Sequence, residues 1–191
     1  MKKHIALFAS GSGTNVQNIA EYFKDHSSIV VSVVLSNNKD AYVLERARNL
    51  GIPSMVFSRE DFYKSDKIIQ LLTDQEIDLI VLAGFLWLVP DNILQAYSGR
   101  IINIHPALLP KYGGKGMYGE RVHQAVKDSG DTLSGISIHY VDEHYDEGQI
   151  IFQATCEVTP DDTPETIAHK VHKLEYEHYP KIIEKLLTAD R

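Results

Sequence analysis

The chain alternates short apolar runs with helix-compatible segments, and this rhythm restricts its fold more than any other feature of the sequence. The apolar runs are rich in β-branched residues, and each is too short to be a long helix. Alternation of this kind predicts a mainly parallel sheet with helices on both faces, a doubly wound α/β fold. The predicted strands are residues 4–9, 29–35, 54–57, 78–83 and 100–104, and the predicted helices are residues 15–24, 42–49, 60–73 and 90–96.

The rhythm changes beyond residue 130. Two neighbouring strands are expected there, joined by an acidic loop over residues 142–148, and a long final helix follows them. Thr163 suits the N-cap of that helix, with Pro164 at its first position and Glu165 favourable to its dipole. We therefore expect an antiparallel C-terminal strand and a long C-terminal helix after the parallel part of the sheet.

Composition indicates one globular domain over residues 1–191. The chain is 43% hydrophobic and 24% charged, and its 191 residues are enough to bury a single core of good size. A formal net charge of -7 argues against nucleic acid as a partner, because binding to a phosphate backbone needs accumulated lysine and arginine. No apolar run approaches the roughly 18 residues of a membrane span, so we expect no membrane association and a cytoplasmic location. The chain has a single cysteine, Cys156, and we expect it to be an ordinary packing residue of a strand.

The stretch Asn103-Ile104-His105-Pro106 carries a polar pair at the end of an apolar run. Side chains two apart on a strand share a face, so Asn103 and His105 should project together where Pro106 ends the ladder. An amide and an imidazole side by side suit acyl transfer, because they can stabilise an oxyanion and accept a proton. The same pair is also typical of a strand end whose polar side chains satisfy the following loop.

A glycine-rich turn, Ser10-Gly11-Ser12-Gly13-Thr14, lies between the first strand and the first helix. Glycines allow a close backbone approach, and the free N–H groups at a helix start favour an anion, so the turn is a candidate phosphate cradle. A dinucleotide-binding motif would need a third glycine where Val16 stands, and an ATP-type loop would need a lysine. A tight strand-to-helix turn without a ligand is the alternative.

The chain resembles the folate-dependent formyltransferases in three elements that occur in the same order. These are the N-x-H-P-x-L-L-P stretch of residues 103–110, the strand residue His139 and the D-x-G turn at Asp146. The resemblance covers nearly the whole chain and implies a Rossmann-like formyltransferase fold. It is closest to members that move the formyl group of 10-formyltetrahydrofolate to the amine of glycinamide ribonucleotide in purine biosynthesis. It therefore implies two small-molecule substrates, formyl-folate as co-substrate and no metal.

The resemblance also assigns roles to residues at matching positions. Asn103 and a protonated His105 would stabilise the oxyanion, Asp146 would favour the imidazolium and His139 would orient this network. Residues 1–100 would form the phosphate-binding half of the domain, and residues 101–191 the catalytic and folate-binding half. The implied binding residues are Gly13, Thr14 and Asn15 for the substrate phosphate, Glu175 for the glycinamide end, and Arg59, Leu86, Trp87, Leu88, Val89 and Asn103 for the folate.

The remaining expectations concern the other histidines, one loop, the alternative functions and the oligomeric state. His169, His172 and His178 invite a metal interpretation, but their spacing fits a solvated helix face better. The glycine-rich residues 111–119 should form a mobile loop that closes over the site. Alternative functions are formyl transfer to a nucleotide sugar, to methionyl-tRNA or to water, or a non-catalytic nucleotide-binding module. The protein is expected to be a monomer or homodimer, with His26, His123 and His144 at its surface.

Overall fold

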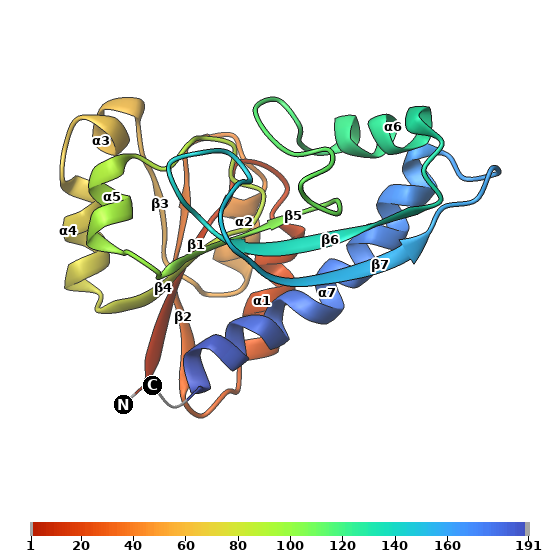
Figure 1. Cartoon of the computed structure of the whole chain (residues 1–191). Helices are drawn as coiled ribbons and strands as arrows, with labels where there is room; N and C mark the ends of the chain where they lie inside the picture. The colour runs from red at the N-terminus through yellow and green to blue at the C-terminus, as the bar shows by residue number, and fades with distance from the viewer. Residues whose placement is uncertain (1, 190–191) are drawn as a thin grey trace.

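A computed structural model describes residues 2–189 and places them around one seven-stranded sheet (Figure 1). The strand order is β3-β2-β1-β4-β5-β6-β7, in which the first five strands pair in parallel and the last two pair antiparallel. This arrangement confirms the predicted fold class. The strands are β1 (Lys3–Phe8), β2 (Ile29–Ser36), β3 (Ser54–Val56), β4 (Ile77–Leu82), β5 (Ile101–His105), β6 (Leu133–Tyr140) and β7 (Ile150–Glu157).

Helices cover both faces of the sheet. Figure 1 shows α3, α4 and α5 on one side and α1 and α7 on the other, with α6 near the start of β6. No helix within residues 2–189 combines the length and apolarity needed to cross a membrane. The helices are α1 (Thr14–Phe23), α2 (Val43–Asn49), α3 (Arg59–Tyr63), α4 (Lys67–Asp74), α5 (Asp91–Ala96), α6 (Glu120–Ser129) and α7 (Pro164–Thr188).

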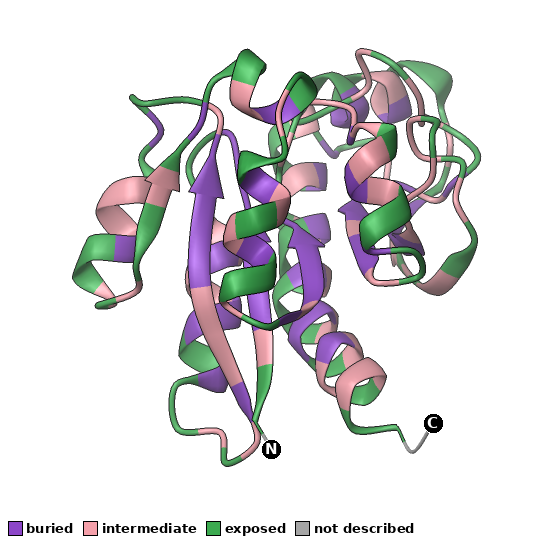
Figure 2. Ribbon diagram, turned by 90° about the vertical axis from the view of Figure 1, so that its left-hand side faces the viewer, coloured by how far each residue is buried: buried purple, intermediate pink, exposed green. Residues whose placement is uncertain are grey.

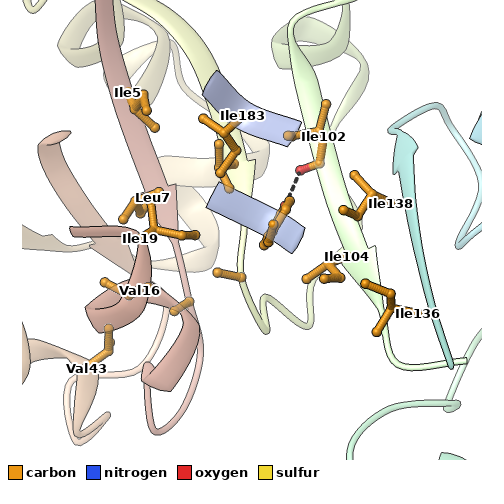
Figure 3. Packing of buried hydrophobic residues seen from close by; sticks show 14 of the residues in the cluster. Ile5, Leu7, Val16, Ile19, Val43, Ile102, Ile104, Ile136, Ile138 and Ile183 are labelled. Carbon is orange, nitrogen blue, oxygen red and sulfur yellow. Dashed lines mark hydrogen bonds between the residues drawn. The ribbon is translucent and has the colours of Figure 1, made fainter. Parts of the chain in front are cut away.

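Strand β1 shows why both faces must be covered. Successive side chains of a strand point to opposite faces, and every residue from Ile5 to Phe8 is buried. Ile5 and Leu7 join a core cluster with residues of α1, α2 and α7, whereas Ala6 and Phe8 join a second cluster with residues of α4 and α5. The buried strands stand out in Figure 2, and Figure 3 shows the first cluster around Ile5, Leu7 and Ile102.

Two helices differ from the expectations. The segment predicted as one helix over residues 60–73 is two helices, because Ser65 bonds through its hydroxyl to the Asp61 carbonyl and to the Lys67 N–H. A capping box between Ser58 and Asp61 starts the first of them. Helix α6 was not predicted at all. It carries three buried residues on one narrow face, Val122, His123 and Val126, so its apolar signal is weak.

Tyr179 fastens the last helix to the middle of the sheet. Its side chain is fully buried, and its hydroxyl donates to the carbonyl of Leu82 on β4 at 2.8 Å. A longer contact of 3.5 Å reaches the carbonyl of Ile102 on β5, a residue labelled in Figure 3. One hydroxyl thus ties α7 to the two strands that end at the site described below.

Replacing Tyr179 by phenylalanine should therefore destabilise the fold. The change keeps the ring and removes a buried donor, so we expect a loss of about 1–2 kcal/mol in the free energy of unfolding. Urea denaturation followed by circular dichroism measures it. The matched control is Tyr176→Phe on the same helix, where the ring is exposed and the stability should stay within about 0.5 kcal/mol. Equal effects of the two changes would contradict this account.

Candidate active site

The register of β5 and β6 places two predicted site residues side by side. Asn103 pairs with His139 across the antiparallel ladder, and its Nδ2 lies 3.1 Å from the Nε2 of His139. The other ring nitrogen of His139 donates to the carbonyl of Tyr140 at 2.8 Å. Because that bond fixes the proton on Nδ1, the Nε2 atom accepts from the Asn103 amide. The strand pairing therefore orients both side chains.

Asp146 reaches the same point from the loop between β6 and β7. Its Oδ2 lies 3.5 Å from the Nδ1 of His105, and its Oδ1 lies 3.6 Å from the Nε2 of His139 and 3.5 Å from the Nδ2 of Asn103. The backbone of Asp146 is left-handed, with φ of 59°, and the N–H of Gly114 donates to Oδ2 at 3.0 Å. The predicted convergence of Asn103, His105 and Asp146 is present in the structure.

His105 is almost completely buried, and both of its ring nitrogens face oxygen atoms. Nε2 donates to the carbonyl of Tyr112 at 2.7 Å, so Nδ1 is the nitrogen that faces Asp146. Burial lowers the pKa of His105 below its ordinary value, and this effect outweighs the opposite effect of the Asp146 charge. Burial therefore favours the neutral imidazole in the unliganded site, and the imidazolium expected from the resemblance would form when His105 accepts a proton.

Asp146 stays ionised although it is largely buried. Burial raises the pKa of Asp146, but the adjacent His139 and His105 rings and the Gly114 N–H together bring it below the ordinary value. A carboxylate thus faces a neutral imidazole nitrogen across 3.5 Å. A proton that arrives at Nδ1 would be stabilised at once by the adjacent charge, which suits a general base.

Removing the Asp146 charge should lower the pKa of His105 further, because the carboxylate is the main group that opposes the effect of burial. We expect a midpoint below about 6.5 in the unaltered protein and a lower one in Asp146→Asn. The ring carbon shift of His105, followed by NMR against pH, measures both. The control is Glu143→Gln, which removes an exposed charge from the same loop and should leave the midpoint unchanged. A rise in the pKa of His105 on removing the Asp146 charge would refute this electrostatic account.

The turn before α1 is built to expose backbone. Gly13 is the N-cap residue of α1, with φ of 73°, and no side chain caps the helix. A Cβ at Gly13 would stand 2.3 Å from Val43, so only glycine lets α2 and this turn approach so closely. The N–H of Val43 donates to the carbonyl of Gly11, which turns that oxygen toward α2. The first N–H groups of α1 therefore have no side-chain acceptor, as a phosphate cradle requires.

Asn15, Glu175 and His172 form a chain of polar contacts beside this turn. The Nδ2 of Asn15 donates to the Oε2 of Glu175 at 3.1 Å, and the Nδ1 of His172 lies 2.7 Å from the same oxygen. The Oδ1 of Asn15 is buried without a hydrogen-bond partner. The hydrogen bond to Glu175 raises the pKa of His172, so this histidine favours its charged form. Sequence reasoning missed His172 as a site residue, although its i, i+3 spacing to Glu175 is a usable signal.

His123 was predicted to be at the surface, and this prediction is wrong. The side chain is 2% exposed because α6 turns it toward α7, where its ring lies 6.3 Å from that of His172. Its Nδ1 is buried without a partner among the described residues. Burial and the neighbouring His172 lower the pKa of His123 to about 4. It is therefore a neutral histidine in the wall of the site.

A cavity of about 760 Å³ joins these features. Its wall includes the turn of residues 10–15, the polar residues Asn103, His105 and Asp146, and the side chains of His172 and Glu175. This volume suits small organic substrates. The residues that the structure describes contain no group of three or more His, Cys, Asp or Glu side chains placed to hold a metal ion.

Of the predicted folate contacts, Leu86 and Asn103 line this cavity, and Arg59, Trp87, Leu88 and Val89 lie outside its wall. Val89 is buried in the second core cluster. The ring of Trp87 packs in an aromatic group with Phe57, Phe62 and Phe85, with the guanidinium of Arg59 4.8 Å from its centre. A folate that contacts these four residues would have to extend past the cavity along the aromatic group, so their roles stay predictions.

Comparison with known proteins assigns the family. A model described as formyl transferase matches residues 3–183. Phosphoribosylglycinamide formyltransferase of Bacillus subtilis is 39% identical over 97% of the chain and 95% of its own length. The chloroplastic protein of the same name from Arabidopsis thaliana is 41% identical over 95% of the chain, which spans 64% of that longer relative. The chain therefore belongs to the formyl transferase family, as its motifs predicted.

Solved structures agree with this assignment. Glycinamide ribonucleotide transformylase 1 from Geobacillus kaustophilus superimposes with a TM-score of 0.88 at 35% identity, over 98% of this chain and all of that one. Phosphoribosylglycinamide formyltransferase from Streptococcus pneumoniae gives a TM-score of 0.85 at 39% identity, again over 98% of this chain and 100% of that one. The fold is thus shared along almost the entire chain.

Proposed function

We propose that this protein transfers the formyl group of 10-formyltetrahydrofolate to the amine of glycinamide ribonucleotide, in purine biosynthesis. The observation that carries this proposal is the single cavity that connects the Asn103, His105 and Asp146 cluster to the turn before α1. In a formyl transferase, the cluster would act on the formyl carbon, and the turn would hold the phosphate of the acceptor. Relatives that carry the name phosphoribosylglycinamide formyltransferase support this choice of acceptor. The expectation of a cytoplasmic monomer or homodimer belongs to the same proposal.

The chemistry follows from the positions of the polar atoms. The neutral amine attacks the formyl carbon, and a new carbon–nitrogen bond forms as the carbonyl oxygen becomes negative. His105 accepts the amine proton at Nδ1, where Asp146 stabilises the resulting imidazolium. The carbonyl then re-forms as the carbon–N10 bond breaks, and N10 receives the proton that His105 had accepted, so tetrahydrofolate leaves, formylated glycinamide ribonucleotide remains and His105 is neutral again. No covalent intermediate with the protein is needed.

Asn103 is the donor for the oxyanion. One hydrogen of its amide goes to His139 at 3.1 Å, and the other makes a long contact of 3.5 Å with Asp146. The second hydrogen is weakly held, so it is the one that can turn to a developing negative charge. His139 keeps the amide in place throughout.

Loss of either proton-handling group should abolish most of the turnover. We expect His105→Ala and Asp146→Asn to lower kcat for formyl transfer to glycinamide ribonucleotide by about two to four orders of magnitude. Release of tetrahydrofolate from the formyl donor, followed with and without the amine, measures this. His144→Ala is the control, since it removes an exposed imidazole from the same loop and should leave turnover unchanged.

The same assay separates the alternative functions. Release of tetrahydrofolate without any amine would indicate transfer to water, and release with a nucleotide sugar or methionyl-tRNA alone would indicate another acceptor. No release with any acceptor would indicate a non-catalytic binding module. Near-normal turnover in His105→Ala would reject the role given to His105.

Asn15 tests the acceptor end of the cavity. Its side chain lies at the first turn of α1 and bonds to Glu175, so Asn15→Ala should raise KM for glycinamide ribonucleotide by about ten-fold and leave KM for the folate almost unchanged. Steady-state kinetics with each substrate varied in turn gives both constants. The matched control is Asn18→Ala, one turn further along α1, where the amide bonds to the carbonyl of Tyr176. Equal rises in both KM values would count against this placement.

A further inference from the structure

Two cationic side chains in the cavity wall have no assigned role. Lys115 and Arg121 are the lysine and arginine side chains that line the cavity, so far as residues 2–189 show. Neither forms an ion pair among the described residues, whereas Lys3, Arg48, Lys67, Lys111, Lys170 and Lys181 each do. The chain has a net charge of -7, and Asp146, Glu165 and Glu175 stand in the same wall. A phosphate that binds here therefore needs a local source of positive charge.

The backbone around these cations is set by glycine. Gly114, Gly116 and Gly119 all have positive φ, at 95°, 87° and 56°, a conformation that other residues rarely adopt. Lys115 lies between the first two. The guanidinium of Arg121, in the first turn of α6, lies 5.2 Å from the centre of the Tyr118 ring and beside Gly116. The segment of residues 114–121 thus presents both cations at the cavity on one compact turn.

Contacts across the helices link this segment to the phosphate end of the cavity. Asn15, in the first turn of α1, bonds to Glu175, which bonds to His172. The ring of His172 lies against that of His123 in α6, two residues after Arg121. Arg121 and Lys115 line the same cavity as this chain of polar contacts and the turn of residues 10–15.

We propose that Arg121 and Lys115 bind the phosphate group of the formyl acceptor, completing a site whose other part is the backbone turn before α1. The proposal rests on the function proposed above and adds to it the positive charge that holds the phosphate of the acceptor. The planar guanidinium can hold two phosphate oxygens at once, and the ammonium acts as a compact second charge. These residues would make the enzyme specific for a phosphorylated amine, because an acceptor without phosphate has nothing to offer them.

The decisive experiment compares glycinamide ribonucleotide with its dephosphorylated riboside as acceptors. Arg121→Gln and Lys115→Gln should each raise KM for the ribonucleotide by about ten-fold, the effect of losing one charge-assisted hydrogen bond. Neither should change kcat/KM for the riboside, nor KM for the formyl donor. Lys111→Gln is the matched control, since Lys111 is in the same loop but bonds to Asp131 outside the cavity, and it should change no constant.

Three results would overturn the proposal. The first is an unchanged KM for the ribonucleotide in the double variant, and the second is an equal loss of kcat/KM with the riboside. The third is a rise in KM for the formyl donor instead, which would assign the cations to the folate carboxylates. Titration calorimetry with ribose 5-phosphate separates this proposal from the proposed function. If the unaltered protein binds ribose 5-phosphate and Arg121→Gln weakens binding, the phosphate site stands even where glycinamide ribonucleotide is not formylated. If the variant binds it equally well, the site is refuted.

Discussion

The close approach of Asp146 to His105 is the contact on which the site depends. A carboxylate in a largely buried place is costly unless several donors face it, and here Asn103 and the Gly114 N–H supply them. Gly148 allows the loop to bring Asp146 to His105, because a Cβ at residue 148 would stand 1.8 Å from the carbonyl of Tyr140. Without that glycine the loop after β6 could not fold back tightly onto the strand. The D-x-G sequence is therefore a structural requirement for the acid–base pair as well as a family motif.

The last helix connects this chemistry to the fold. Tyr179 of α7 is fully buried and bonds to the carbonyl of Leu82, while Glu175, one turn earlier, is 4% exposed and faces the cavity. Asn15 at the start of α1 bonds to Glu175. The acceptor end of the cavity is thus held by two helices that pack on the same face of the sheet. A change that shifts α7 would alter the stability of the core and the position of Glu175 together.

Much of this arrangement was readable from the sequence because it follows from strand periodicity and chain order. Asn103 and His105 share a face by spacing alone, and parallel strands must end at one edge, so their place was predictable. His123 was not, because its burial comes from the packing of α6 on α7, and α6 is mostly polar, so it did not stand out as a helix with a buried face. The long helix expected over residues 60–73 failed for a local reason, the hydroxyl of Ser65, which competes for backbone groups.

The pKa of His105 shows a different limit of sequence reasoning. The resemblance implied an imidazolium during the reaction, which the nearby carboxylate favours, whereas burial of the ring favours the neutral form. The degree of burial decides the direction of the pKa shift of His105, and the ring is buried beside Tyr112 of the 111–119 loop. The carbonyl of Tyr112 accepts from Nε2, and the N–H of Gly114 donates to Asp146, so residues 112–114 bind both members of the acid–base pair. Movement of this segment would break both hydrogen bonds and admit water, which lessens the effect of burial on the pKa of His105. Because the same segment leads directly into Lys115 and Arg121, the proposed binding of the phosphate and the basicity of His105 would be coupled through one short stretch of backbone.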